Sequence, residues 1–265
     1  MMPVTIVTGA SAGIGAELAR VFARNGHNLV LVARRKERLI ALAAEIAATG
    51  RRAPVILPID LALRDAIAQI AQALTARALE PQYIVNNAGF GLIGAAATLD
   101  RAKQCSMIDL NIRALTDLSL AFVDSLTRTS GGVLNVASVA GFLPGPGMSV
   151  YYATKACVLS FSEALHQELK ARNVRVTCLC PGPVETEFAS RAGAVERAAP
   201  AFLSISAGRV AEAGYRGLMR GQRLVVPGVA NKIVSFLPRI LPRPLLLTVL
   251  AARQKRRTPS PASRT

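Results

Sequence analysis

The sequence predicts an α/β fold in which a doubly wound parallel sheet of about seven strands carries helices on both faces. Two observations predict it. Short β-branched runs alternate strictly with longer helical patterns, and several of the runs are apolar throughout, as strands covered on both faces are. The composition agrees, because 51% of the 265 residues are hydrophobic and only 18% are charged. Such a content excludes a chain that is disordered over most of its length.

The elements follow one another in a regular order. The expected strands cover residues 4–8, 28–33, 54–59, 83–86, 132–137, 174–180 and 224–226. The expected helices lie at residues 13–25, 35–48, 61–78, 100–129, 150–172 and 207–221. Parallel neighbours need right-handed crossovers, which these helices supply. The result is a Rossmann-like sandwich, a fold that binds its ligands at the carboxyl ends of the strands.

The first strand runs directly into a glycine-rich turn, Gly9-Ala-Ser-Ala-Gly-Ile-Gly15, which is followed by an Ala- and Leu-rich helix. Glycines let a pyrophosphate approach main-chain N–H groups at a helix N-terminus, where the helix dipole favours an anion. An ordinary glycine-containing turn is the alternative, which the position between strand and helix disfavours. We expect the phosphates of a dinucleotide to be bound by Gly9, Ser11, Gly13, Ile14 and Gly15.

The end of the second strand bears on the choice of cofactor. An acidic side chain at this point accepts a hydrogen bond from the ribose 2′-OH of NAD, whereas a 2′-phosphate calls for arginine. Here Ala33 is followed by Arg34 and Arg35. Guanidinium groups pair well with phosphate, so the sequence predicts NADP(H) in preference to NAD(H). The alternative is that the two arginines only solvate the start of a helix.

Three further segments carry candidate chemistry. Asn86-Asn-Ala-Gly89 follows the fourth strand, Ser138 comes just past the fifth, and Tyr151-Tyr-Ala-Thr-Lys155 opens a helix. Tyr151 and Lys155 stand at i and i+4, on one helix face, and a nearby cation favours tyrosinate. We therefore expect the pKa of Tyr151 to lie below its reference value, which suits proton transfer near neutral pH. Tyr152 has no lysine four residues on.

Together with the glycine turn, these segments resemble the short-chain dehydrogenase/reductase family, in its one-domain form, over roughly residues 3–228. The resemblance implies an enzyme in which Tyr151 is the general acid/base of carbonyl–alcohol interconversion and Ser138 hydrogen-bonds the substrate oxygen. Lys155 would lower the pKa of the tyrosine and contact the nicotinamide ribose. Asn111 falls where the family has the asparagine of a water-linked proton relay. The cofactor would carry the hydride, since no side chain can.

The resemblance also implies further cofactor contacts. They are Asp60 and Leu61 near the adenine, Asn87, Ala88 and Gly89 beside the cofactor, and Val184 and Thr186 flanking the nicotinamide carboxamide. Asp60 and Thr186 each have an alternative role as a helix cap.

The alternative to an enzyme is a non-catalytic NADP-binding or membrane-associated interaction protein that retains the fold. Ser138, Tyr151, Lys155 and Asn111 together count against that alternative, because a binding module needs no proton relay.

The substrate is expected to contact residues 187–206, after the loop that follows the sixth strand. Apolar side chains dominate this segment, and Phe90, Phe142, Leu143 and Met148 lie near the expected cleft. We expect a small-molecule carbonyl or alcohol of moderately apolar, including lipid-like, character.

No metal is expected, because His27 and His166 have no cysteine or carboxylate at ligand spacing and are expected at the surface. The cysteines form no C-x-x-C pair, which favours a reduced, cytoplasmic setting.

The net charge of +16 is unevenly distributed. Residues 1–212 carry 21 basic and 16 acidic side chains, whereas residues 213–265 carry 11 basic and no acidic ones. We expect a redox domain at residues 1–230 and a basic, apolar extension at 231–265 that includes a helix opened by Pro244 and a disordered end from residue 253. The extension has three interpretations: simple packing, peripheral contact with an anionic membrane, or nucleic-acid binding, the last disfavoured because no aromatic residues interleave with the charge. Association into a homo-dimer or homo-tetramer through the long helices is also expected.

Overall fold

The computed structural model describes residues 1–188, 192–193 and 203–255. Its centre is a seven-stranded, wholly parallel sheet in the order β3-β2-β1-β4-β5-β6-β7. The strands are β1 (Met2–Thr8), β2 (Leu29–Val32), β3 (Val55–Leu57), β4 (Leu79–Asn86), β5 (Gly132–Val136), β6 (Arg175–Leu179) and β7 (Leu224–Val225). The predicted fold class and the number of strands are confirmed.

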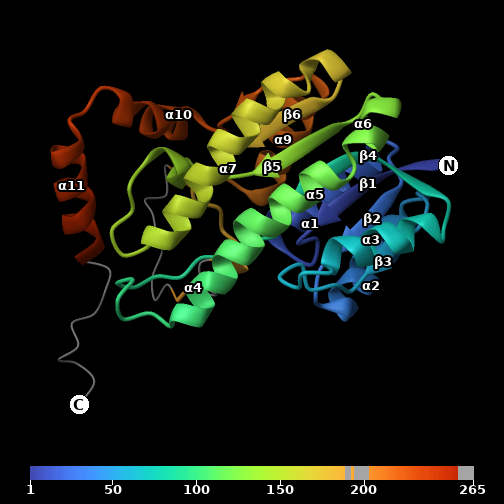
Figure 1. Cartoon of the computed structure of the whole chain (residues 1–265), viewed down its shortest axis with the longest axis horizontal. Coiled ribbons are helices and arrows are strands. Elements are labelled where there is room, and N and C mark those ends of the chain that lie inside the picture. The colour runs from blue at the N-terminus through green and yellow to red at the C-terminus, as the bar shows by residue number, and fades with distance from the viewer. Residues whose placement is uncertain (189–191, 194–202, 256–265) are drawn as a thin grey trace.

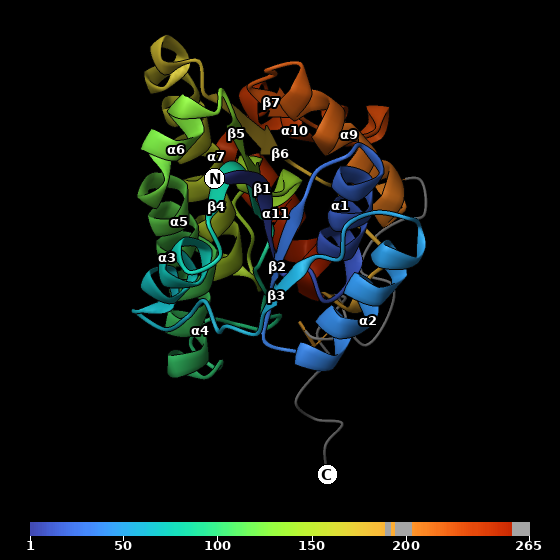
Figure 2. The same ribbon diagram turned by 90° about the vertical axis from the view of Figure 1, so that its right-hand side faces the viewer.

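Helices cover both faces of the sheet, as Figure 2 shows with the sheet almost edge-on. One face carries α1 (Gly13–Arg24), α2 (Lys36–Ala48) and α9 (Ala207–Met219). The opposite face carries α3 (Ala66–Thr75), α5 (Leu115–Ala121) and α7 (Ser149–Glu168), together with α4 (Arg101–Ile108) and α6 (Val123–Arg128). The all-apolar runs are thus buried on both sides, and every residue of β2 and β5 is buried.

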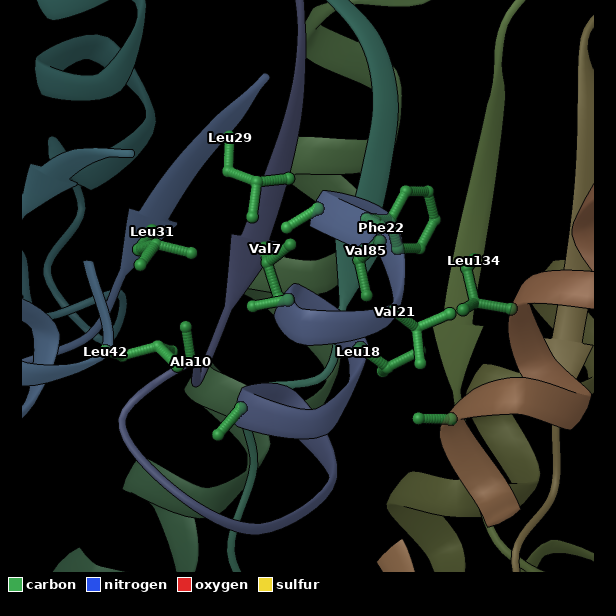
Figure 3. Close-up of a cluster of buried hydrophobic side chains, with 14 of the residues drawn as sticks. Val7, Ala10, Leu18, Val21, Phe22, Leu29, Leu31, Leu42, Val85 and Leu134 are labelled. Atoms are coloured by element: carbon green, nitrogen blue, oxygen red, sulfur yellow. The ribbon is translucent and has the colours of Figure 1, made fainter. Parts of the chain in front are cut away.

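The core on the α1 side is built from side chains of helix and sheet that interdigitate (Figure 3). Leu18, Val21 and Phe22 of α1 lie against Val7 and Val85 of the two central strands, and all five are fully buried. Burying one side chain of this size is worth roughly 1.5–3 kcal/mol. This packing fixes α1 against β1, and so fixes the turn between them where the glycines stand.

Two predicted boundaries around α3 differ from the structure. The helix expected from residue 61 begins only at Ala66, because Asp60 accepts a hydrogen bond from the Ala62 amide through Oδ1, at 3.0 Å, and starts a turn. Asp60 therefore does not cap a helix. The strand expected from residue 83 begins at Leu79, because β1 pairs with it as far back as Met2. A register shift in β1 lies beside Pro81, which has no N–H to donate.

The single helix expected at residues 100–129 is divided. It starts as predicted, with Asp100 accepting from the Lys103 amide at 2.7 Å, but the run Asp109–Ala114 is a π-helical turn between α4 and α5. Phe122 leaves helical geometry and separates α5 from α6. A π turn rotates the residues it contains relative to the rest of the helix, and such turns are frequent at functional sites. The sequence has no glycine or proline at either break in the helix.

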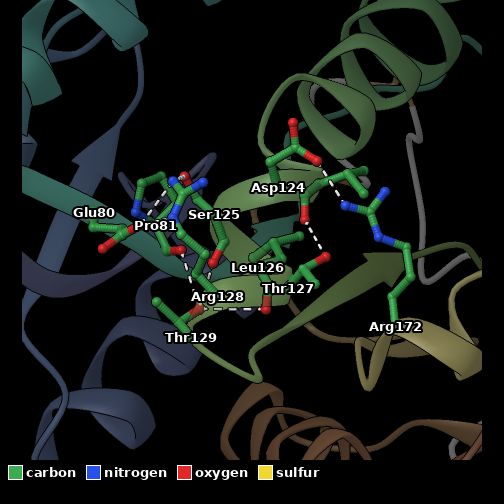
Figure 4. A network of polar contacts seen from close by, with 10 residues as sticks. Glu80, Pro81, Asp124, Ser125, Leu126, Thr127, Arg128, Thr129 and Arg172 are labelled. Carbon is green, nitrogen blue, oxygen red and sulfur yellow. Dashed lines mark hydrogen bonds and ion pairs between the residues drawn. The ribbon is translucent and has the colours of Figure 1, made fainter.

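Ion pairs link α6 to β4 and to the turn that follows α7 (Figure 4). Arg128 reaches Glu80 of β4, with 2.8 Å between Nη2 and Oε1, and Arg172 reaches Asp124, with 2.6 Å between Nη2 and Oδ1. The Arg172 and Asp124 side chains are both solvent-exposed, and such a pair contributes only about 0–1 kcal/mol. The effect of both ion pairs is to orient the short helix, while its own Leu126, whose side chain is fully buried, supplies the stabilisation.

The C-terminal part of the described chain forms α10 (Val229–Phe236) and α11 (Arg243–Lys255), which extend away from the sheet at the left of Figure 1. The helix predicted to open at Pro244 is confirmed, and it continues to Lys255, past the point where disorder was expected. Asn231 is buried and donates from Nδ2 to the carbonyl oxygens of Leu203 and Pro227, at 3.2 and 3.0 Å. The domain division at residue 230 stays a prediction. No described helix is both long and apolar enough to cross a bilayer.

Candidate active site

The predicted site residues gather at the carboxyl ends of the central strands. The glycine turn follows β1, the Asn86-Asn-Ala-Gly89 segment follows β4, Ser138 follows β5, and the Pro181-Gly-Pro-Val-Glu-Thr186 loop follows β6. Strand order reverses at β1, since β2 lies on one side of it and β4 on the other. A crevice at such a switch point is where doubly wound sheets bind their ligands.

The glycine turn is packed so tightly that side chains would not fit. Gly9 and Gly13 adopt φ angles of +63° and +56°, which favour glycine. A Cβ on Gly15 would collide with the carbonyl of Gly9 and with the amide of Asn87, and one on Gly13 would lie 3.0 Å from the Thr186 methyl group. Gly13 opens α1, so its turn presents a helix N-terminus. These features fit the pyrophosphate of a dinucleotide.

Thr8, which sequence reasoning missed, joins this turn to the segment after β4. Its hydroxyl donates to the Val85 carbonyl at 3.1 Å and accepts from the amides of Asn87 and Ala88, at 3.0 and 3.1 Å. Asn87 in turn donates a hydrogen bond from Nδ2 to the Thr8 carbonyl oxygen at 3.0 Å. The predicted residues Asn87 and Ala88 are thereby fixed against the glycine turn. Only the position of Thr8 at the end of a strand hinted at this role.

The two predicted phosphate-binding arginines have different surroundings. Arg35 donates to Ser11 Oγ from Nε at 3.2 Å and from Nη2 at 3.0 Å, which places a guanidinium group directly on the glycine turn. Arg34 is 72% exposed and forms a loose ion pair with Asp60, with 3.6 Å between Nη1 and Oδ2. Leu61, the other predicted adenine contact, is buried in the hydrophobic core. Arg35 and Ser11 therefore supply the best-organised phosphate donors.

The loop after β6 closes the far side of the glycine turn. Thr186 packs against Gly13, and its Oγ1 accepts from the Phe188 amide at 3.3 Å, a local turn contact of the capping kind. Val184 packs on the core beneath α1, as does Ile14 of the turn. Val184 and Thr186 thus lie close to the predicted phosphate site, where the loop can border a cofactor that crosses from β1 toward β5.

Ser138 stands at the end of β5 with its hydroxyl directed at the neighbouring loop. Its Oγ accepts from the Ala140 amide at 3.1 Å and lies 3.4 Å from the Pro181 carbonyl oxygen, to which it donates. The first contact caps the short 3₁₀ helix Val139–Phe142. The Ser138 hydroxyl also lies beside the Tyr151 phenol, where hydrogen bonding from Ser138 acts to lower the pKa of that phenol. Ser138 and Tyr151, 13 residues apart in sequence, therefore meet as predicted.

Tyr151 lies in the first turn of α7 and is buried. Burial raises the pKa of its phenol, and hydrogen bonding with Ser138 offsets this only in part. The predicted lowering of the tyrosine pKa is thus wrong for this structure, because the desolvation of a buried phenolate outweighs the charge of a lysine whose Nζ lies 5.9 Å from the ring centroid. Burial therefore favours the neutral phenol over the phenolate.

Lys155 is also buried, and its ammonium group is held by the sheet. Nζ donates to the Val136 carbonyl at 2.8 Å, and burial lowers the pKa of Lys155 to about 8. A Cβ on Gly89 would lie 3.7 Å from this Nζ and 2.9 Å from the side-chain oxygen of Asn111. Gly89 therefore leaves the space in which Lys155 and Asn111 approach each other.

Asn111 occupies the π-helical turn and is fully buried. Its Nδ2 donates to the Phe90 carbonyl at 3.0 Å and to Thr154 Oγ1 at 3.1 Å, and its Oδ1 accepts from the Phe90 amide at 3.1 Å. The same Thr154 hydroxyl donates to the Tyr151 carbonyl at 2.7 Å. Asn111 thus joins the loop after β4 to the helix that carries Tyr151 and Lys155, with Thr154, which sequence reasoning missed, as the bridge.

Apolar side chains surround the Tyr151 ring. Phe90, Met148 and Phe188 pack in one cluster with it, and the ring centroids of Tyr151 and Phe188 are 5.4 Å apart. A Cβ on Gly91 would lie 3.0 Å from Phe188 and 3.2 Å from Tyr151. Of the expected substrate segment, residues 189–191 and 194–202 lie outside the described residues. The described part places an apolar wall beside the phenol.

The comparisons with known proteins decide the family. A family model described as short chain dehydrogenase matches residues 3–196. The chain belongs to the short-chain dehydrogenase family. It is therefore an oxidoreductase, and nicotinamide dinucleotides are the cofactors for which the glycine turn of this short-chain dehydrogenase is suited.

Named relatives agree with this assignment. A protein named sulfoacetaldehyde reductase 2 from Chromohalobacter salexigens is 38% identical over 191 residues, which cover 71% of this chain and 75% of that protein. A short-chain dehydrogenase from Sphingobium yanoikuyae, solved in complex with NADPH, superposes with a TM-score of 0.78 at 32% identity, over 91% of this short-chain dehydrogenase and 97% of that chain. A bulky-bulky ketone specific alcohol dehydrogenase from Comamonas testosteroni gives a TM-score of 0.75 at 28% identity, over 91% and 96% of the two chains.

The two histidines of this short-chain dehydrogenase lie apart from the site, whereas Cys178 and Cys180 are buried at the end of β6, beside Lys155. His27 is half-buried among Phe22, Tyr83 and Tyr215, and His166 contacts the Val176 carbonyl, with 2.7 Å between Nδ1 and the oxygen. Their expected surface positions are wrong, because both rings complete the packing of α1 and α7 on the sheet. Within the described ranges, no group of His, Cys, Asp and Glu could hold a metal ion.

Proposed function

We propose that the protein is an NADP(H)-dependent oxidoreductase that interconverts a carbonyl and a secondary alcohol on a moderately apolar substrate, with Tyr151 as general acid/base. The observation that carries the proposal is the position of the Tyr151 phenol, which lies beside the Ser138 hydroxyl and against an apolar wall. A buried hydroxyl pair of this kind can hold a carbonyl oxygen and give it a proton, which is the contribution that general acid catalysis requires.

Each polar residue of the site has a distinct part in the proposal. The nicotinamide, when bound, supplies or accepts the hydride. Tyr151 donates its proton to the carbonyl oxygen during reduction, and Ser138 hydrogen-bonds that oxygen. Lys155 contacts the nicotinamide ribose and, because its pKa is lowered to about 8, can pass a proton on toward the tyrosine near neutral pH. Asn111 holds the loop after β4 in place.

Preference for NADP(H) rests on the arginine side of the glycine turn. Arg35 and Ser11 offer a guanidinium group and a hydroxyl at the end of β2, where the ribose 2′ position is bound in this fold. No acidic side chain follows β2 directly, since Ala33, Arg34 and Arg35 stand there. A 2′-phosphate gains charge-assisted hydrogen bonds at this place that a 2′-hydroxyl does not.

The substrate class rests on the wall of Phe90, Met148 and Phe188 around Tyr151. An apolar pocket with few polar groups at one end suits a ketone or aldehyde with an aliphatic or aromatic body. The named relatives act on an aldehyde in one case and on bulky ketones in another, and both are carbonyl compounds. We therefore place the substrate of this protein among apolar carbonyl compounds, lipid-like ones included.

A substrate screen tests the proposal. Ketones and aldehydes of graded size are incubated with the full chain and either NADPH or NADH, and cofactor oxidation is followed by absorbance. We expect turnover of apolar carbonyl compounds with a higher kcat/KM for NADPH, and loss of that preference in Arg35→Met. Tight NADPH binding without turnover of any carbonyl compound would favour the non-catalytic rival. An unchanged cofactor preference in Arg35→Met would refute the assigned phosphate site.

A second proposal concerns the C-terminal surface, defined as the exposed apolar residues Val229, Ile233 and Phe236 of α10 with Ile240, Leu245 and Val249 beyond it. Lys232, Arg239 and Arg243 are exposed beside them, and residues 213–265 contain no acidic side chain. Apolar groups rimmed by cations fit an anionic lipid surface. Two copies of so basic a segment would repel each other, so we propose a peripheral membrane contact rather than self-pairing.

Co-sedimentation with liposomes tests the membrane contact. We expect the full chain to sediment with vesicles that contain anionic lipid and to stay in solution with purely zwitterionic ones. Replacing Ile233 and Phe236 by serine, or Lys232, Arg239 and Arg243 by glutamine, should each reduce sedimentation. Equal sedimentation of the wild type and both variants would refute the proposal.

Homo-oligomerisation remains a further proposal. Ile108 at the end of α4 and Leu120 on α5 are 43% and 49% exposed, on helices that cover one face of the sheet. Apolar side chains exposed on neighbouring helices suit contact with a second copy. Light scattering coupled to size-exclusion chromatography should give at least twice the monomer mass, and Leu120→Arg should lower that mass. A monomer at all concentrations would refute it.

A further inference from the structure

A carboxylate already occupies the arginine side of the glycine turn. Glu187, which directly follows Thr186 in the loop after β6, reaches back 152 positions in the chain to Arg35, with 2.9 Å between Oε2 and Nη1. Its other oxygen, Oε1, lies 3.1 Å from Nη1 of Arg38 on α2. Both oxygens therefore engage a guanidinium group, and one of these groups is the one that lies on Ser11.

The geometry of this cluster resembles that of a bound phosphate. Carboxylates and phosphates both accept paired hydrogen bonds from guanidinium groups, and they use the same N–H donors. Arg35 already directs Nε and Nη2 to Ser11, so its Nη1 is the donor that Glu187 takes. A 2′-phosphate at Arg35 must share or replace this contact, and its negative charge repels the carboxylate. The 2′-hydroxyl of NAD brings no charge and no such conflict.

We propose that Glu187 is an internal competitor of the cofactor 2′-phosphate, and that it sets how strongly the protein discriminates NADP(H) from NAD(H). The inference rests on the proposed preference for NADP(H), because it assumes that the phosphate binds at Arg35. Glu187 contacts Arg35 and Arg38, on the cofactor side of the site. It is a specificity-determining residue, which acts through the arginines that it holds.

The effect has a limited expected size. The Arg35 and Glu187 side chains are 30% and 37% exposed, so solvent screens the pair. Partly exposed ion pairs are worth at most about 1 kcal/mol, which corresponds to roughly two- to fivefold in affinity. Screening also predicts that the effect shrinks as salt is added, because the Debye length falls to about 3 Å at 1 M.

Titration calorimetry of the full chain with two nucleotides isolates this contribution. The probes are adenosine 2′,5′-bisphosphate and adenosine 5′-monophosphate, which differ in the 2′-phosphate and need no turnover. We expect Glu187→Gln to bind the bisphosphate about two- to fivefold more tightly at low salt and the monophosphate unchanged. The shorter carboxylate of Glu187→Asp cannot span both arginines. The affinity of this variant for the bisphosphate should therefore lie between the affinities of the wild type and Glu187→Gln. Thermal melting verifies that each variant is folded.

Control variants separate the possible failures. Glu185→Gln removes the same charge from the same loop and should leave the ratio of the two affinities as in the wild type. An equal gain in Glu185→Gln, or no gain in either Glu187 variant, overturns the inference. Arg35→Met should weaken the bisphosphate alone, and if it does not, the phosphate site itself is wrong. If Arg35→Met weakens the bisphosphate while both Glu187 variants bind it like the wild type, only the role of Glu187 fails.

Discussion

Asn111 donates a hydrogen bond to Thr154 over 3.1 Å, and this contact ties the π-helical turn between α4 and α5 to the helix that carries Tyr151 and Lys155. The same asparagine satisfies both the amide and the carbonyl of Phe90. One side chain thus positions the loop after β4 and the start of α7 relative to each other. Because the phenol and the lysine stand on that helix, the contact controls where they lie in the site.

Replacing Asn111 by leucine should therefore damage both stability and turnover. The amide and carbonyl of Phe90 would lose their partner in the interior, and unpaired buried polar groups cost about 1–3 kcal/mol each. We expect the free energy of unfolding to fall by about 2–6 kcal/mol in urea titrations, because two groups are left unpaired. We also expect kcat to fall by a larger factor than KM changes, because the proton donor loses its position while the apolar wall remains.

Asn135→Leu is the matched control for that experiment. Asn135 is equally buried on β5, accepts from Asn86 at 2.9 Å and donates to Ser162 at 3.0 Å, and neither contact is with Tyr151, Lys155 or Ser138. The Asn135→Leu variant should lose about as much stability as Asn111→Leu. At a temperature where it is folded, it should keep the turnover of the wild type. If Asn135→Leu loses as much kcat as Asn111→Leu, the Asn111 contact has no specific role.

Gly15→Ala tests the fit of the glycine turn to a dinucleotide. The added methyl group would collide with the Gly9 carbonyl and the Asn87 amide, so the backbone of the turn must shift. Overpacking of this kind costs about 1–3 kcal/mol, and the shift should weaken NADPH binding at least tenfold. Fluorescence titration measures it. Gly208→Ala, where the methyl group meets only Glu17 at 3.6 Å, should bind NADPH like the wild type, and equal losses in both variants would argue against the turn.

Much of the fold follows from the sequence because burial on both faces leaves a strong pattern. Runs such as residues 29–32 are wholly apolar, and the structure buries all of β2. Glycines, Asn87, Ser138 and Tyr151 follow strands or open helices, so parallel topology alone brings them to one edge of the sheet. The family resemblance then supplies the roles, which remain proposals.

Features that depend on tertiary contact could not be predicted in the same way. The π turn at Asp109–Ala114 consists of ordinary helix-compatible residues, and only its packing shows the extra residue. The pairing of Glu187 with Arg35 joins segments 152 positions apart, with no local signal. The pKa of Tyr151 was predicted in the wrong direction because the i, i+4 spacing shows the lysine charge but does not show the burial that opposes it.

Gly91→Ala tests the apolar wall. A methyl group there would lie 3.0 Å from Phe188 and 3.2 Å from Tyr151, and would narrow the space beside the phenol. One methylene in a hydrophobic pocket changes discrimination by about 1–3 kcal/mol. The ratio of kcat/KM for a bulky ketone to that for a small one should therefore fall about tenfold or more. An unchanged ratio would place the substrate elsewhere.

The lowered pKa of Lys155 predicts how stability depends on pH. The folded lysine loses its proton at about pH 8, while the unfolded one keeps it to about 10.5. Between pH 8 and 10 the unfolded state therefore binds more protons, and the contribution of Lys155 to the free energy of unfolding rises with pH. Above pH 10 Tyr151, whose pKa is raised by burial, acts in the opposite direction, because the unfolded phenol ionises first.

Urea titrations of the wild type and Lys155→Met, at fixed protein concentration, measure this contribution. We expect the difference in free energy of unfolding, wild type minus variant, to be constant below pH 7.5 and to rise from pH 8 to 10 by at most about 1.4 kcal/mol per pH unit. A difference that stays flat, or falls, across that window would show that Lys155 keeps an ordinary pKa.

A comparison of Tyr151→Phe with Tyr152→Phe tests whether Tyr151 gives its proton to a carbonyl oxygen. Each variant is assayed for NADPH oxidation with the best ketone from the substrate screen, and NADPH binding is measured separately by fluorescence. We expect Tyr151→Phe to bind NADPH like the wild type but to turn over about 10²–10⁴-fold more slowly, while Tyr152→Phe stays active. Wild-type turnover in Tyr151→Phe would contradict this role of Tyr151.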